Sequence, residues 1–135
     1  SFPTRRSSDL KTILIVDDEE DFGFFVKANL EARGSYRVRI ATSSEQGIEL
    51  ALRYKPVAIL LDIMMPRVDG FQTLKRLKEQ DRTMFIPVIM LTAKHDDESR
   101  ISAAGLYCDG YLTKPVKIDD LVARLDKVLG MRETA

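Results

Sequence analysis

The sequence predicts an α/β protein with a doubly wound, five-stranded parallel sheet and five helices. From residue 11 onward, short β-rich segments alternate with segments of helical periodicity. The central segment 57–61 is apolar throughout, as expected for a strand that is covered on both faces. Strands that alternate with helices favour parallel pairing through right-handed crossovers. The fold class, rather than periodicity, favours the strand order 2-1-3-4-5.

The first half of the chain is expected to form two strand–helix pairs. A β-rich run at 12–16 predicts the first strand. The helix after it ends at Gly34 and is indicated by side chains at helical spacing, namely Phe22, Phe25, Val26, Asn29 and Leu30. Segment 36–41 alternates apolar and basic residues, which is typical of a half-exposed strand. A capping box from Ser43 begins the next helix, which ends at Pro56 and has Ile48, Ala51 and Leu52 on its apolar side.

The second half continues the alternation after the strand at 57–61. A loop at 62–70 contains the turn pair Asp69-Gly70, and the helix after it is marked by Phe71, Leu74 and Leu77. The remaining elements are expected as a strand at 86–91, a helix at 96–104, a strand at 108–112 and a helix at 116–129. Gly130 is expected to end the last helix, whose inward side carries Leu121, Leu125, Val128 and Leu129.

Composition indicates one domain in a reducing compartment. The 135 residues suffice for a single core, and 21 basic residues balance 21 acidic ones, so no overall field attracts nucleic acid or membrane. Cys108 is the only cysteine, which excludes an intrachain disulfide and fits a reducing cytoplasm. The sequence has no secretory signal pattern and no apolar run near the roughly 20 residues that span a bilayer. We therefore expect a cytoplasmic protein.

Residues 1–10 differ from the rest of the chain. They are polar and aperiodic, and they resemble the translation of a common short-read sequencing adapter. We interpret them as a non-native leader; a natural disordered leader is the alternative. The predicted organisation is therefore a domain at 11–130, followed by a short tail at 131–135.

Three aspartates follow buried strands of the predicted sheet. Asp17 and Asp18 end the apolar run 13–16, and Asp62 ends the run 57–61. In the expected strand order these two strands are neighbours, so the three carboxylates converge at one edge. Carboxylates gathered at a buried position are costly without a compensating positive charge, and a divalent cation held by oxygen ligands supplies one. The pattern predicts phosphate chemistry on Mg²⁺.

The acidic positions and two later motifs together resemble a response-regulator receiver domain of two-component signalling. They are Asp17-Asp18, Asp62, Thr92-Ala93 and Lys114-Pro115. Their spacing is similar to that of the chemotaxis-type single-domain regulator, and the resemblance extends from about residue 11 to 129. It implies a flavodoxin-like fold and a signalling switch rather than a turnover enzyme.

The resemblance also implies the ligands and the acceptor of the site. Asp62 would accept a phosphoryl group from a kinase phosphohistidine or a phosphotransfer protein. Mg²⁺ would be held by Asp18 and Asp62, by Asp17 largely through water, and by the backbone carbonyl of Met64. The apolar side chain of Met64 borders the path of attacking water and is expected to slow hydrolysis of the phosphorylated form.

Further residues are implied to contact the phosphoryl group and to transmit the signal. Lys114 and Thr92 would contact the phosphoryl oxygens, and the Lys114–Pro115 bond would be cis. Thr92 and Tyr111 would then move, which would alter the surface of the fourth helix, fifth strand and fifth helix for a downstream partner. Tyr107 stands where many relatives carry glycine, so that surface is expected to differ locally.

Other interpretations remain at this point. Asp17, Asp18 or Thr92 alone is most often a helix cap, and Lys114 alone is a solvated lysine, but the five residues including Asp62 have no common structural explanation. A magnesium phosphatase of the haloacid-dehalogenase type would need an Asp-x-Asp motif on the first strand, and a flavodoxin-like FMN carrier would need a phosphate loop there. Within the receiver interpretation, the chain is a stand-alone regulator, a phosphorelay intermediate or part of a larger protein.

Overall fold

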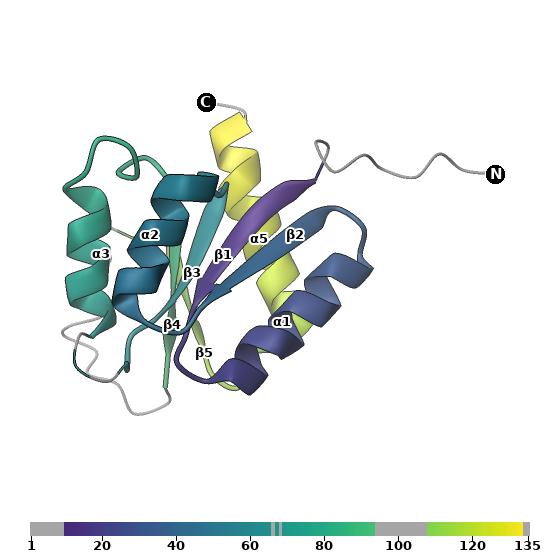
Figure 1. Cartoon of the computed structure of the whole chain (residues 1–135). Helices are drawn as coiled ribbons and strands as arrows, with labels where there is room; N and C mark the ends of the chain where they lie inside the picture. Colours follow the sequence, from purple (N-terminus) through teal and green to yellow (C-terminus); the bar gives the residue numbers. More distant parts are fainter. Residues whose placement is uncertain (1–9, 66, 68, 94–107, 134–135) are drawn as a thin grey trace.

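The computed structural model describes residues 10–65, 67, 69–93 and 108–133. Five parallel strands form one sheet in the order β2-β1-β3-β4-β5 (Figure 1). The strands are β1 (Lys11–Val16), β2 (Tyr36–Ala41), β3 (Ala58–Asp62), β4 (Val88–Thr92) and β5 (Gly110–Thr113). The predicted parallel sheet and its strand order are confirmed.

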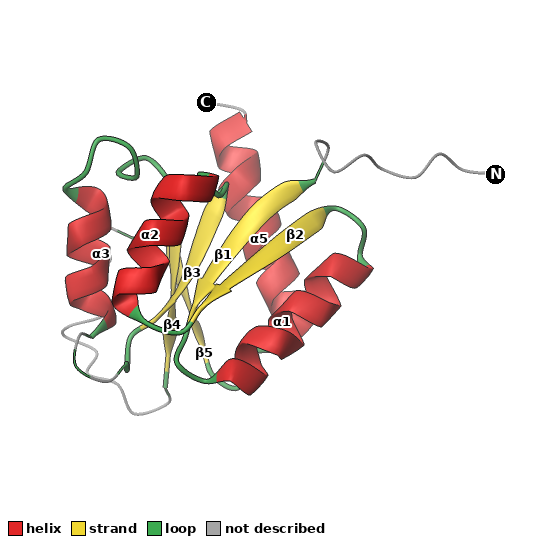
Figure 2. Ribbon diagram, viewed as in Figure 1, coloured by secondary structure: helices red, strands yellow, loops and turns green. Residues whose placement is uncertain are grey.

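Four helices are present among the described residues, and they cover both faces of the sheet (Figure 2). They are α1 (Glu20–Ala32), α2 (Ser44–Tyr54), α3 (Gly70–Lys78) and α5 (Ile118–Glu133). Helices α1 and α5 pack on one face, and α2 and α3 pack on the other. The helix expected at 96–104 lies outside the described residues, so its prediction is untested.

The core has two layers because successive side chains of a strand point to opposite faces. In β1, Leu14 and Val16 pack with α2 and α3, whereas Ile13 and Ile15 pack with α1 and α5. Every residue of β3 is buried, as the apolar run predicts for a strand between two helix layers. The sheet is therefore packed between two helix layers, and the carboxyl ends of its parallel strands lie along one edge.

Two local expectations differ from the structure. Phe25 is 44% exposed, because the buried stripe of α1 runs through Gly23, Val26 and Leu30, and the Phe25 ring instead stacks on Phe22. Gly130 does not end α5, which continues to Glu133. A glycine ends a helix when it adopts a positive φ, and Gly34 is the only glycine that does so in the described part of the chain.

Strand boundaries shift by at most two residues, and β2 has the predicted bounds. Strand β4 begins at Val88 rather than at residue 86, because the Ile86 N–H donates to the Thr83 carbonyl in the preceding turn and Pro87 has no N–H to donate. The predicted cap of α2 is present, since the Ser43 hydroxyl accepts a hydrogen bond from the Gln46 N–H at 3.2 Å.

Candidate functional site

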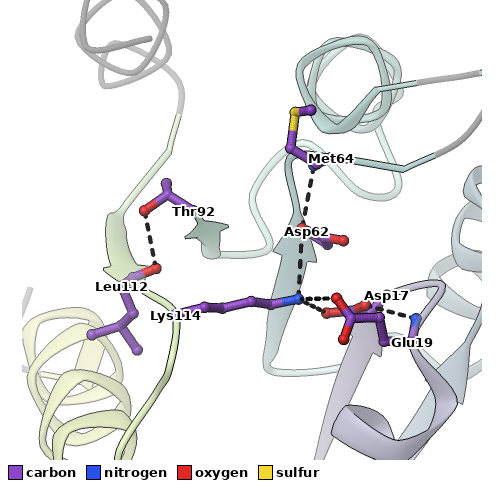
Figure 3. A network of polar contacts seen from close by, with 7 residues as sticks. All are labelled: Asp17, Glu19, Asp62, Met64, Thr92, Leu112 and Lys114. Atoms are coloured by element: carbon purple, nitrogen blue, oxygen red, sulfur yellow. Dashed lines mark hydrogen bonds and ion pairs between the residues drawn. The ribbon is translucent and has the colours of Figure 1, made fainter. Parts of the chain in front are cut away.

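The predicted site residues lie at the carboxyl ends of adjacent strands (Figure 3). Asp17 follows β1, Asp62 is the last residue of β3, Thr92 is the last residue of β4, and Lys114 follows β5. The parallel pairing of β1 with β3 brings Asp17 and Asp62 to the same edge although 45 positions of sequence numbering separate them. This edge is where open α/β sheets bind ligands.

The three aspartates lie close enough to share one cation. One carboxylate oxygen from each of Asp17, Asp18 and Asp62 lies within 4.8 Å of the other two. Asp17 is fully buried and Asp62 is 4% exposed, whereas Asp18 is open to solvent. Several carboxylate oxygens with one side open to water match the needs of Mg²⁺, which keeps several of its waters. The donors therefore fit a hard divalent cation.

The Lys114 ammonium lies between the acidic residues. Its Nζ is 2.8 Å from Asp17 Oδ2, 3.5 Å from Glu19 Oε1 and 3.9 Å from Asp62 Oδ1. Burial opposes the charged form of Lys114, but the Asp17 hydrogen bond and the nearby carboxylates outweigh it and raise the pKa of the amine. The Lys114–Pro115 peptide bond is cis.

Asp62 is held in an environment that disfavours its charge. Burial is the largest cause, and the neighbouring Asp17 carboxylate adds to it; together they raise the pKa of Asp62 to about 7. The Lys114 charge and the Met64 N–H, which donates to Asp62 Oδ1 at 3.2 Å, act in the opposite direction. Without a cation, the site therefore favours the protonated form of Asp62 more than water does.

We expect Asp62→Asn to stabilise the metal-free protein at pH 8. The native state retains the Asp62 proton up to about pH 7, whereas the unfolded chain releases it near pH 4, so wild-type stability falls across this window. Each pKa unit corresponds to about 1.4 kcal/mol, so removing the charge should raise the free energy of unfolding by about 2–4 kcal/mol at pH 8. Denaturant unfolding in EDTA measures it.

The gain from Asp62→Asn should shrink steadily as the pH falls from 8 to 4, because the wild-type carboxyl becomes protonated in both states. Asp81→Asn is the control, since Asp81 is an exposed residue on the turn after α3. A gain from Asp62→Asn that is independent of pH would show that the buried charge is not its cause.

Thr92 and Tyr111 lie at the β4–β5 side of the site. Thr92 is buried, and its hydroxyl lies 3.4 Å from the Leu112 carbonyl and 3.3 Å from the Thr113 hydroxyl, so it faces β5 (Figure 3). Tyr111 on β5 is 52% exposed. The structure thus gathers Asp17, Asp18, Asp62 and Lys114, while Thr92 lies at the end of the neighbouring strand. Tyr107 lies outside the described residues.

Two features of the site were missed by sequence reasoning. Glu19 was not among the expected site residues, yet its carboxylate lies 3.5 Å from the Lys114 ammonium. The Asp69-Gly70 pair was interpreted only as a turn, but Asp69 caps α3 and Gly70 packs directly against the backbone of Asp62. The cap had a sequence signal, an aspartate before an amphipathic segment, whereas the close approach of Gly70 depends on tertiary structure.

No helix in the described part of the chain is both long and apolar enough to cross a bilayer.

Comparison with known proteins is consistent with this site. The chain is 40% identical over 117 residues to the DNA-binding dual master transcriptional regulator RpaA of Synechocystis, covering 87% of this chain and 48% of that protein. It is 41% identical over 119 residues to the phosphate regulon transcriptional regulatory protein PhoB of Pseudomonas aeruginosa, covering 88% and 52%. The chain thus spans about half the length of these curated relatives.

The fold is also similar to that of solved receiver structures. A putative response regulator from Chloroflexus aurantiacus superposes with a TM-score of 0.81 at 31% identity, covering 90% of this chain and 98% of that one. Residues 13–126 match the response regulator receiver domain family. The chain therefore belongs to the receiver domains of the response regulators of two-component systems.

Proposed function

We propose that the chain is a phosphoacceptor switch in which Asp62 takes a phosphoryl group from a histidine kinase or a phosphotransfer protein. One observation carries the proposal. The buried Asp62 carboxylate lies beside two further carboxylates and has the Lys114 ammonium 3.9 Å away. This arrangement supports a role for Asp62 as the nucleophile, for the carboxylates as cation ligands and for Lys114 as a positive charge beside them.

The proposed step is a displacement at phosphorus. An Asp62 carboxylate oxygen forms the new P–O bond as the P–N bond of the phosphohistidine breaks, and the imidazole leaves. Asp18, Asp62 and the Met64 carbonyl, with Asp17 largely through water, would hold Mg²⁺, and the ion would supply positive charge that reduces repulsion between the carboxylate and the phosphoryl group. By favouring the ionised form of Asp62, the same charge counteracts the raised pKa of the metal-free site.

Lys114 and Thr92 have separate parts in this proposal. The Lys114 ammonium provides a positive charge for the phosphoryl oxygens, and the Thr92 hydroxyl donates a hydrogen bond to them after turning away from β5. A phosphorylated aspartate carries about −1.5 to −2 charge in place of the single charge of the carboxylate, and it presents new acceptor oxygens, which together can bias a two-state equilibrium. Tyr111, exposed on β5, would move with Thr92 and reshape the adjoining surface for a downstream partner.

The proposal includes a downstream protein that binds the altered surface, but it does not identify that protein. Two of the relatives are transcriptional regulators by name, and this chain matches about half of each. A stand-alone regulator, a relay intermediate and the receiver part of a larger regulator all use the same acceptor chemistry. The proposal therefore concerns Asp62 and the surface around β5, and not a particular output.

Incubation with acetyl phosphate and Mg²⁺, followed by intact mass measurement, tests the proposal. We expect an adduct of one phosphate that depends on Mg²⁺ and is absent in EDTA. A response-regulator receiver that is known to label serves as the positive control. If that control labels and this chain does not, the chain is a receiver that no longer accepts phosphate.

Replacing Met64 with asparagine should shorten the lifetime of the phosphorylated form. Met64 lies two residues after Asp62 and its side chain is 61% exposed, so an apolar group borders the solvent side of the acceptor. A polar group there can hold the attacking water with a hydrogen bond worth about 1 kcal/mol, which corresponds to roughly a fivefold faster decay. Decay is followed by intact mass after the donor is removed.

Met84→Asn is the matched control for this lifetime. Met84 is a second exposed methionine, and it lies in the turn between α3 and β4 rather than beside Asp62. Its variant should decay at the wild-type rate. Equal lifetimes for Met64→Asn and the wild type would remove any role for the apolar side chain at position 64.

A further inference from the structure

The Lys114 ammonium is held more closely by residues that lead from β1 into α1 than by the acceptor. Asp17 Oδ2 and Glu19 Oε1 lie 2.8 Å and 3.5 Å from Nζ, whereas Asp62 Oδ1 lies 3.9 Å away (Figure 3). The Lys114 Nζ also lies 4.7 Å from the centroid of the Phe22 ring, which approaches it from the α1 side. Asp17 and Glu19 lie in the connection from β1 to α1, and Phe22 lies in the first turn of α1.

Glu19 is directed toward Lys114 by its own local structure. It occupies the N-cap position of α1, but its side chain makes no cap hydrogen bond. Its backbone N–H instead donates to Asp17 Oδ1 at 2.9 Å, which fixes the Glu19 backbone next to the site. The carboxylate is thereby left to pair with Lys114, although an N-cap side chain usually accepts from its own helix.

We propose that Glu19 is a positioning residue that retains the Lys114 ammonium on the α1 side and thereby slows phosphoryl transfer to Asp62. The proposal rests on the proposed role of Asp62 as acceptor. Lys114 must turn an N–H toward the phosphoryl oxygens, and each N–H directed at Glu19 is withdrawn from that task. Asp17 is fully buried and remains as an anchor when Glu19 is changed, so the ammonium gains freedom without leaving the site.

Two substitutions separate the contact from the charge. Glu19→Gln removes the charge, and Glu19→Asp keeps it but shortens the side chain by one methylene, which takes the carboxylate beyond the 3.5 Å contact. At saturating Mg²⁺ and equal acetyl phosphate, both variants should label about two- to fivefold faster than the wild type, the range that corresponds to an exposed ion pair. Glu20→Gln, at the neighbouring exposed position, should label at the wild-type rate.

A second measurement does not depend on phosphorylation. Acylation of Lys114 by acetic anhydride, quantified by peptide mass spectrometry, should be faster in both Glu19 variants relative to Lys75, an exposed lysine of α3. Unchanged Lys114 acylation would overturn the proposal, because Glu19 would not hold the ammonium. Glu19→Asp labelling at the wild-type rate, or Glu20→Gln labelling as fast as Glu19→Gln, would also overturn it in favour of a general charge effect.

The two proposals fail differently. A wild-type chain that takes no phosphate contradicts the acceptor role of Asp62, and the rate effect assigned to Glu19 is contradicted with it. A chain that labels normally, with no change in either Glu19 variant, contradicts only the positioning role.

Discussion

An Asp62→Asn chain should take up no phosphate from acetyl phosphate and Mg²⁺, while the wild type gains one. The amide nitrogen and oxygen of asparagine are poor nucleophiles at neutral pH, whereas a carboxylate oxygen needs no deprotonation once it is ionised. The variant keeps an oxygen that can accept the Met64 N–H, so its local structure should persist. We expect complete loss of the adduct in intact mass spectra.

Two comparisons make this loss interpretable. The expected gain in metal-free stability of the same variant at pH 8 would show that it is folded, so the loss could not be ascribed to unfolding. Asp81→Asn should label like the wild type, since Asp81 is exposed outside the site. An adduct that persists in Asp62→Asn, and that peptide mapping locates on Asp18, would assign the acceptor to the exposed member of the acidic trio.

The Gly70→Ala chain should be strongly destabilised. A Cβ at this position would overlap the Asp62 carbonyl oxygen and lie 2.7 Å from Ile63 Cα. Both atoms belong to the backbone of the acceptor segment, so neither can move as a flexible side chain would. Gly70 also donates its N–H to the Ile63 carbonyl at 2.7 Å, which holds the start of α3 against this segment. We expect a loss of about 3 kcal/mol in the free energy of unfolding.

Gly130→Ala is the matched control, because a Cβ there meets no atom within 4 Å and the residue lies within α5. Alanine is the better helix former, so this variant should be equal to the wild type or more stable by up to about 1 kcal/mol. Denaturant unfolding compares the two variants. Gly70→Ala with wild-type stability would mean that the acceptor segment can move away from α3, contrary to the packing seen here.

Much of the fold and the gathering of the acids followed from sequence. The apolar run before Asp62 predicted a strand covered on both faces, and β3 is fully buried. Acids directly after two such runs predicted a shared edge, and the oxygens of Asp17, Asp18 and Asp62 lie within 4.8 Å of one another. These predictions succeeded because a strand buried on both faces is visible in the sequence as a continuous apolar run, and parallel pairing brings the ends of such runs to the same edge of the sheet.

Features that depend on how distant segments pack could not be predicted in this way. Phe25 has the same helical spacing as its buried neighbours, and only the width of the buried stripe of α1 leaves it exposed. Gly130 is a residue type that often ends helices, but its φ is not positive and α5 continues through it. Glu19 and Lys114 are in contact in space but far apart in the sequence, so no local sequence pattern indicates this contact.

The groups gathered at the sheet edge come from the ends of four strands, β1, β3, β4 and β5, or from the connections that leave them. No fragment of the chain therefore contains the complete arrangement, and chemical competence is a property of the cooperatively assembled domain. Detachment of β5 alone would remove the lysine while leaving the carboxylates in place. Reactivity toward a small phosphodonor is in this sense a probe of global integrity, and it would vanish on partial opening before most of the sheet had come apart.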